Sequence, residues 1–276
     1  MNIQLIALDL DGTTLQNDHL SISPKTQRVI TAAIEKGILI VPTTGRLNSL
    51  LPQSIVNING ICYAITSNGA VTYDLRTGKM IYSNFMNREV IVELLDLIPM
   101  DKVLVELFKD GRLFVERKCL ANLSEHPVPF MHLEFLKDIH VPVDSLREFI
   151  HENSDRIEKI NLPYVPVELR NSLWRQLSSL DSISLTSSVP DNMEINDVKA
   201  NKGAALQKLC NFLHIPAKNV MAIGDGGNDI EMLKFAGVSV APENAVEEAK
   251  TAAMEITLAN DEDGAALAIE KYALKN

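Results

Sequence analysis

The fold of this chain is decided by one stretch near its start, Ile3-Gln4-Leu5-Ile6-Ala7-Leu8-Asp9-Leu10-Asp11-Gly12-Thr13. Apolar residues run almost unbroken into two aspartates, which are followed by a glycine–threonine turn. An apolar run of this length predicts a buried parallel strand, and ligands bind at the carboxyl ends of such strands. A buried carboxylate without a partner is costly, so a cation or strong donors should face Asp9 and Asp11. The alternative is a strand end followed by an ordinary Asx-type turn.

The composition is that of a globular protein with a sizeable core and a net negative charge. The chain has 276 residues, of which 46% are hydrophobic and 22% charged, and its formal net charge is −10. This length suits one large domain or two modest ones. The negative charge disfavours nucleic acid and anionic membranes as partners. A small anionic substrate remains compatible, because a bound metal ion would dominate the field around it.

The cysteines and the N-terminus predict a cytoplasmic protein. Cys62, Cys119 and Cys210 are odd in number and widely spaced, which fits neither a disulfide framework nor a CxxC metal site. We interpret them as thiols in or near the core in a reducing compartment. The first apolar run stops at Asp9, too early for a signal peptide or a membrane span.

The first part of the chain alternates strands and helices. Ser23-Pro24 predicts the start of a helix that ends at Gly37, and residues 38–43 form a second apolar run. We expect Thr43-Thr44-Gly45-Arg46 to open another helix and residues 62–66 to form a third strand. This order predicts an α/β fold with a Rossmann-like parallel-sheet core and helices on both faces.

The middle of the chain has a different pattern. A helix over 87–98 precedes a hairpin turn at Asp110-Gly111, and hairpins belong to antiparallel sheets. Residues 118–142 show no regular pattern. We expect an inserted α+β cap domain over 82–188, flanked by a core made of 1–81 and 189–276, with a short strand at 193–195 opening the second core segment.

A second acidic cluster follows another apolar strand, at Gly224-Asp225-Gly226-Gly227-Asn228-Asp229. Alone, this stretch is also compatible with a solvated turn. Two strand ends that both carry carboxylates would repel each other if they met in a parallel sheet. A divalent cation removes that repulsion, and an all-oxygen ligand set suits Mg²⁺.

Two further residues have the opposite polarity. Thr44 and the amides that follow it can donate hydrogen bonds to an anion, and Lys202 at a helix start can supply a compact positive charge. Alone, Lys202 would be interpreted as a solvated lysine. Together with Mg²⁺, the two residues would complete a cage for a phosphoryl group during transfer.

In order along the chain, these stretches resemble the four motifs of the haloacid dehalogenase-like superfamily. The four segments are Asp9-Leu10-Asp11-Gly12-Thr13, Thr43-Thr44-Gly45-Arg46, Lys202-Gly203 and Gly224 to Asp229. The position of the insertion, between the second and third motifs, is similar to that in the Cof-type phosphatases with a C2 (C2B) cap.

The resemblance implies a role for each motif residue. Asp9 would be the nucleophile, and Asp11 the general acid and then the general base. Mg²⁺ would be held by the Asp9 carboxylate, the Asp11 backbone carbonyl and Asp225, with Asp229 supporting it through water. The substrate-side residues implied are Thr44, Gly45, Arg46, Asn68, Lys202 and Asn228.

The function implied is that of a Mg²⁺-dependent phosphatase, a hydrolase of phosphoric monoesters. It would hydrolyse small phosphorylated metabolites, such as sugar phosphates, through an aspartyl-phosphate intermediate. Two alternatives remain at this point. A phosphosugar mutase would return the phosphoryl group to a second hydroxyl, and a non-enzymatic phosphate-responsive binding protein would not turn over at all.

Overall fold

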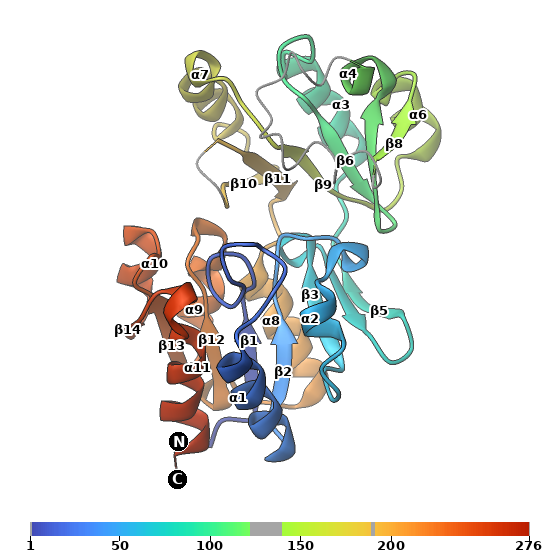
Figure 1. Cartoon of the computed structure of the whole chain (residues 1–276). Helices are drawn as coiled ribbons and strands as arrows, with labels where there is room; N and C mark the ends of the chain where they lie inside the picture. Colours follow the sequence, from blue (N-terminus) through green and yellow to red (C-terminus); the bar gives the residue numbers. More distant parts are fainter. Residues whose placement is uncertain (1, 122–139, 189–190, 276) are drawn as a thin grey trace. The chain divides into compact units, whose positions relative to one another are not determined.

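The chain folds into two compact units in this computed structural model, which describes residues 2–121, 140–188 and 191–275 (Figure 1). The first unit is made of residues 1–83 and 201–276, and the second of residues 84–200. The second unit therefore extends further toward the C-terminus than the insertion expected over 82–188. No helix in the described ranges combines the length and apolar character needed to cross a membrane.

The first unit is built on a five-stranded sheet in which every neighbouring pair is parallel, in the order β14-β13-β12-β1-β2. The five strands are β1 (Leu5–Leu8), β2 (Leu39–Pro42), β12 (Val220–Ile223), β13 (Val238–Pro242) and β14 (Glu255–Thr257). A second, antiparallel sheet of this unit contains β3 (Tyr63–Thr66), β4 (Val71–Asp74) and β5 (Lys79–Ser83). The expected parallel core is confirmed, but β3 pairs along its length with β4. Among the described residues, its pairing with the parallel sheet is an isolated Thr43–Ile65 bridge.

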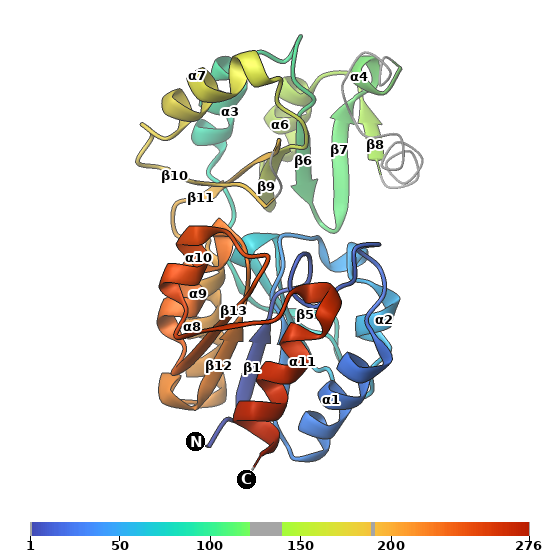
Figure 2. The same cartoon turned by 60° about the vertical axis from the view of Figure 1, so that its left-hand side comes forward.

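Helices cover both faces of the parallel sheet, as Figure 2 shows. They are α1 (Pro24–Glu35), α2 (Gln53–Val56), α8 (Lys202–Leu213), α9 (Ile230–Phe235), α10 (Glu247–Ala252) and α11 (Gly264–Ile269), the last continued by a π-helical turn over Glu270–Leu274. Helix α1 begins as expected, because the Ser23 side chain accepts the Thr26 amide proton and Pro24 occupies its first turn.

The two-sided cover explains the unbroken apolar run of β1. Ile6 and Leu8 pack in the core cluster that includes residues of α1 and α11. Leu5 and Ala7 point to the other face, where they pack with residues of α8, α9 and α10. A central parallel strand has no polar face, so its side chains need not alternate between apolar and polar.

The second unit contains a six-stranded sheet in the order β10-β11-β9-β6-β7-β8, antiparallel except for the pair β7–β8. Its strands are β6 (Glu106–Lys109), β7 (Arg112–Glu116), β8 (His140–Val143), β9 (Ile157–Leu162), β10 (Ile183–Thr186) and β11 (Met193–Asp197). Its helices are α3 (Arg88–Leu97), α4 (Arg117–Ala121), α6 (Leu146–Asn153) and α7 (Val167–Leu177). The expected hairpin is present, with Asp110 and Gly111 both at positive φ between β6 and β7.

Three local expectations differ from the structure. Strand β11 does not open the second core segment, because it pairs antiparallel with β9 and β10 in the second unit. No long helix follows Gly45; a 3₁₀ turn (Asn48–Leu50) comes next, and Pro52 keeps Leu51 extended, which separates that turn from α2. The segment expected to be irregular, 118–142, holds the end of α4 and the start of β8, and residues 122–139 lie outside the described part.

Candidate active site

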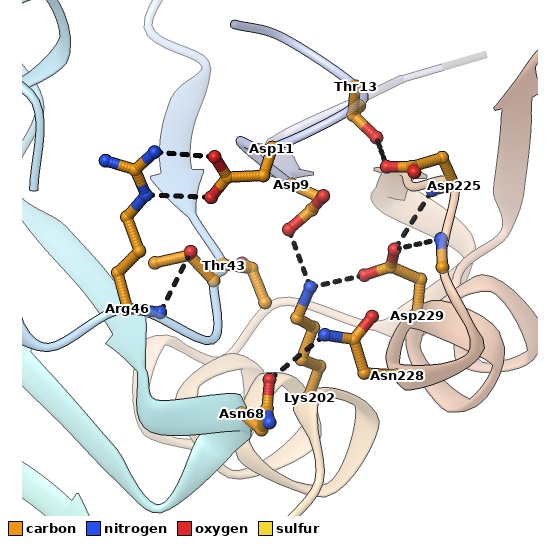
Figure 3. A network of polar contacts seen from close by, with 12 residues as sticks. Asp9, Asp11, Thr13, Thr43, Arg46, Asn68, Lys202, Asp225, Asn228 and Asp229 are labelled. Atoms are coloured by element: carbon orange, nitrogen blue, oxygen red, sulfur yellow. Dashed lines mark hydrogen bonds and ion pairs between the residues drawn. The ribbon is translucent and has the colours of Figure 1, made fainter. Parts of the chain in front are cut away.

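The polar segments singled out in the sequence meet at one edge of the parallel sheet. Strand β1 lies between β2 and β12 in parallel register, so the three strands end side by side. Asp9 follows β1, Thr44 follows β2 and Asp225 follows β12 within two residues of each strand end. Lys202 is the first residue of α8. Figure 3 shows the side chains of Asp9, Asp225 and Lys202 converging from separate elements.

Lys202 is the cation at the centre of this group. Its side chain is 1% exposed, and its Nζ donates to Asp9 Oδ1 and to Asp229 Oδ1, each at 2.6 Å. A buried cation at a helix N-terminus is opposed by both desolvation and the helix dipole. Burial alone lowers the pKa of Lys202, but Asp229 and Asp9 outweigh it and raise that pKa above its ordinary value. The lysine is therefore held charged by two carboxylates.

Asp229 is anchored on both of its carboxylate oxygens. Oδ1 accepts from Lys202, and Oδ2 accepts the backbone N–H groups of Asp225 and Gly226 at 3.0 and 2.8 Å. The residue is fully buried. Asp229 thus fixes both the ammonium group of Lys202 and the loop that carries Asp225.

Asp225 faces the glycine turn that follows β1. Thr13 Oγ1 donates to Asp225 Oδ1 at 2.5 Å. Gly12 has a φ of +73°, and a Cβ atom added there would lie 2.4 Å from Asp225 Oδ2. The glycine of the first motif is therefore required both for its left-handed backbone and for the close approach of the Asp225 carboxylate.

Asp9, Asp225 and Asp229 form an acidic cluster, with one carboxylate oxygen of each lying within 4.8 Å of the others. Burial and the charge of Asp229 raise the pKa of Asp9 well above its ordinary value, although Lys202 acts in the opposite direction. The same two causes raise the pKa of Asp225 to about 6. Three carboxylates around one lysine leave excess negative charge, which a divalent cation would neutralise.

Asparagine and threonine side chains line the neighbouring part of the site. The Thr44 hydroxyl accepts the backbone N–H of Arg46 at 3.1 Å, which leaves its own proton to donate. Asn228 donates from Nδ2 to Asn68 Oδ1 at 3.0 Å. Asn68 has a left-handed backbone, with φ +57°, and lies in the turn after β3. This contact joins the loop after β12 to the turn after β3.

Asp11 lies apart from the acidic cluster. Arg46 donates to it with Nε at 2.7 Å to Oδ2 and with Nη2 at 2.5 Å to Oδ1, and His19 Nδ1 lies 2.9 Å from Oδ1. In Figure 3 its carboxylate is directed toward Arg46 and away from Lys202. Burial raises the pKa of Asp11, but the hydrogen bonds from Arg46 and His19 outweigh it and hold that pKa well below its ordinary range.

The contacts described above involve nine of the ten residues predicted for the site. The tenth, Gly45, is half-buried and lies between Thr44 and Arg46 in the chain. Sequence reasoning gave no site role to three residues that contact the site, namely Thr13 of the first motif, Thr14 and His19. Thr14 Oγ1 donates to the Asp9 carbonyl at 2.5 Å, and its place directly after the first motif is a usable signal. His19 had no such signal, because it reaches Asp11 from an irregular loop at φ +57°.

Comparison with known proteins identifies relatives that span the whole chain. A family model described as haloacid dehalogenase-like hydrolase matches residues 6–269. The chain is 30% identical over 274 residues to a protein of Bacillus subtilis named 5-amino-6-(5-phospho-D-ribitylamino)uracil phosphatase YcsE, covering 99% of this chain and 97% of the relative. It is 29% identical over 283 residues to phosphatase YwpJ of the same organism, covering 96% and 98%.

Solved structures with the same architecture include two bacterial hydrolases. A haloacid dehalogenase-like hydrolase from B. subtilis superposes with a TM-score of 0.82 at 28% identity, covering 98% of this chain and all of the other. A second such hydrolase, from Bacteroides thetaiotaomicron, gives a TM-score of 0.79 at 26% identity, covering 98% and 99%.

Proposed function

The chain belongs to the haloacid dehalogenase-like hydrolases and is a phosphatase of that family, and we propose that it hydrolyses small phosphorylated metabolites with Mg²⁺ through an aspartyl-phosphate. The observation that carries this proposal is the environment of the Asp9 carboxylate. Its carboxylate is buried at the end of the central strand, faces Lys202 and shares a cluster with Asp225 and Asp229.

The donor set of the cluster fits a hard divalent cation. All three side chains offer carboxylate oxygens, and the pKa values of Asp9 and Asp225 are raised, as expected for acids that lack enough positive charge nearby. We expect Asp9, the Asp11 backbone carbonyl and Asp225 to hold Mg²⁺. Asp229 is the supporting residue, because both of its oxygens already accept protein hydrogen bonds. When bound, Mg²⁺ would neutralise phosphoryl oxygens and keep Asp9 ionised.

In the first step, the Asp9 carboxylate attacks phosphorus and the bond from phosphorus to the leaving oxygen breaks. That oxygen takes a proton from the Asp11 carboxyl group and leaves as an alcohol. In the second step, water attacks phosphorus and gives a proton to the Asp11 carboxylate. The bond between Asp9 and phosphorus breaks, which returns the Asp9 carboxylate and releases inorganic phosphate.

Thr44 and Lys202 would stabilise the group in transfer. The Thr44 hydroxyl accepts the Arg46 amide proton, so its own proton is oriented to donate elsewhere. The Lys202 ammonium group adjoins the attacking carboxylate at 2.6 Å and adds positive charge where the phosphoryl oxygens gather. Asn228 and Asn68 are hydrogen-bonded to each other and would border the substrate beside the phosphoryl group.

The substrate class we propose is a phosphate ester of a polyhydroxylated carbon chain, such as a sugar or a sugar alcohol. Two B. subtilis relatives, at 30% and 27% identity over nearly their full length, are named as phosphatases of 5-amino-6-(5-phospho-D-ribitylamino)uracil. That compound carries its phosphate on a ribityl chain. We expect the second unit to select among such esters.

The test is phosphate release from a panel that contains this ribityl compound, hexose phosphates and pentose phosphates, with Mg²⁺ and with chelator. The Asp9→Asn variant should release no phosphate and form no acid-stable phosphoenzyme. The control is Asp101→Asn, because Asp101 is an exposed aspartate of the second unit. Activity that persists in Asp9→Asn or in chelator would refute the mechanism, and an isomerised phosphosugar without free phosphate would favour a mutase.

A further inference from the structure

The Asp11 carboxylate is contacted by two side chains, Arg46 and His19, which also contact each other; we call the three residues the Asp11 clamp. Arg46 binds its carboxylate through two parallel hydrogen bonds, at 2.7 and 2.5 Å, and His19 adds a third contact at 2.9 Å. Arg46 Nη2 also donates to the His19 carbonyl at 2.7 Å. A two-pronged guanidinium–carboxylate contact is among the strongest and most directional hydrogen-bonded pairs in proteins.

Hydrogen bonds from Arg46 and from a neighbouring loop connect the Asp11 clamp to the rest of the site. The backbone N–H of Arg46 donates to the hydroxyl of Thr44, and its Nη1 reaches the Leu50 carbonyl at 3.4 Å. Ser54 Oγ donates to the carbonyl of Leu20, next to His19, at 2.5 Å. The loop that carries His19 is thus tied to the segment after β2 on both sides of the clamp.

The clamp and the proton-transfer role require different positions of one carboxylate. A general acid must carry a proton and lie within hydrogen-bond reach of the leaving oxygen. In this structure both Asp11 oxygens accept from Arg46, and the carboxylate is directed away from Lys202 and the acidic cluster (Figure 3). Asp11 cannot keep these contacts and also protonate a leaving group beside Asp9.

We propose that Arg46 and His19 are positioning residues that hold Asp11 in an inactive, parked orientation, and that Asp11 must leave these contacts in each catalytic cycle. This inference rests on the proposed role of Asp11 as the acid. Detachment adds to the barrier of a step that needs a proton from Asp11, and leaves unchanged a step that needs none. Weakening the clamp should therefore accelerate only the proton-dependent transfer.

The leaving group separates the two kinds of step. p-Nitrophenolate departs as an anion without a proton, whereas the alkoxide of glycerol phosphate must be protonated as it leaves. The measurement is the single-turnover rate of phosphoenzyme formation with each substrate, by rapid quench in the presence of Mg²⁺. Phosphoenzyme formation precedes hydrolysis, so the second role of Asp11 does not affect it.

The variant is His19→Gly, which removes one clamp contact and suits the left-handed backbone at that position. The matched control is His214→Gly, because His214 is exposed at the end of α8 with almost the same φ, +56° against +57°. We expect the glycerol phosphate rate to rise about two- to fivefold in His19→Gly, the range for one solvent-exposed charged contact. The p-nitrophenyl phosphate rate and both control rates should not change.

Arg46→Lys provides a second variant, since an ammonium group cannot make the paired contact. It should shift the ratio of the two rates in the same direction. Equal changes with both substrates, no change, or a selective loss with glycerol phosphate would overturn the parked orientation. If the unaltered protein forms no phosphoenzyme with either substrate, the proposed function itself fails, and that result is seen before any variant is compared.

Discussion

Replacing Lys202 by methionine tests whether the acidic cluster depends on one buried cation. Methionine keeps the unbranched stem of the side chain and removes its charge. Lys202, Asp9 and Asp229 are 1%, 5% and 0% exposed, so none of the three can be solvated without a rearrangement. Removing one partner of a buried ion pair costs roughly 3–5 kcal/mol. Asp229 keeps two backbone donors, so the loss falls mainly on Asp9, and we expect about 3–4 kcal/mol.

A loss of this size lowers the folding equilibrium constant of the first unit roughly 10²–10³-fold. It should be larger at pH 8 than at pH 6. Without Lys202, the pKa of Asp9 rises further above its value in the unfolded chain. The folded state then gains by binding a proton at low pH, and that gain is lost as the pH rises through the folded-state pKa.

The assay is urea unfolding followed by far-ultraviolet circular dichroism, in chelator and in Mg²⁺. Trp174 is the single tryptophan of the chain and belongs to the second unit, so its fluorescence reports that unit separately. Lys208→Met is the matched control, because Lys208 is an exposed lysine of the same helix.

Mg²⁺ should recover part of the stability of Lys202→Met, since it would return positive charge beside Asp9. The reasoning is refuted if Lys202→Met loses no more stability than Lys208→Met in chelator. It is also refuted if Mg²⁺ stabilises Lys202→Met less than it stabilises the unaltered protein.

Three further predictions concern the acidic cluster. Gly12→Ala should bind Mg²⁺ more weakly in calorimetry, because its Cβ would meet Asp225 Oδ2 at 2.4 Å. The control Gly37→Ala, at a similar positive φ with no atom within 4 Å, should lose stability but no Mg²⁺ affinity. Equal Mg²⁺ affinities of the two variants would contradict the close approach of Gly12 and Asp225. Burial raises the pKa of Asp225 to about 6, so Mg²⁺ affinity should fall as the pH drops from 7.5 to 5.5, and an unchanged affinity would exclude Asp225 as a ligand. Asp9→Asn should abolish activity and raise the melting temperature in chelator at pH 8, because it removes a buried charge whose pKa is raised. A lower melting temperature would mean that the attraction between Asp9 and Lys202 stabilises the fold more than the repulsion among the acids destabilises it.

The sequence was sufficient for the parts of the fold that local rules control. Two-sided burial made β1 readable as an apolar run, and Ser23-Pro24 marked the start of α1 through its cap. It was insufficient where distant pairing decides. The short apolar pattern of β11 is compatible with a strand of either unit, and its antiparallel pairing with β9 and β10 places it in the second. The long helix expected after Gly45 is absent, because Pro52 keeps Leu51 extended and separates the 3₁₀ turn from α2.

The same division holds within the site. Asp9, Asp225 and Asp229 are placed by strand ends and backbone hydrogen bonds, so their positions follow from the motifs and the parallel sheet. Asp11 is placed by the side chains of Arg46 and His19, which lie 35 and 8 residues away in sequence and carry no pattern that pairs them with it.

The two aspartates of the opening motif therefore differ in a way that their spacing does not reveal. Asp9 faces other acids in a buried site, which raises its pKa, whereas Asp11 faces Arg46 and His19, which lower its pKa. Asp9, the proposed nucleophile, must stay ionised but has a raised pKa, whereas Asp11, the proposed acid, must carry a proton but has a lowered pKa. Both shifts are opposite to what the proposed chemistry needs. A metal ion beside Asp9 and the release of Asp11 from Arg46 would each reverse one of them, and the proposed mechanism needs both changes in each turnover.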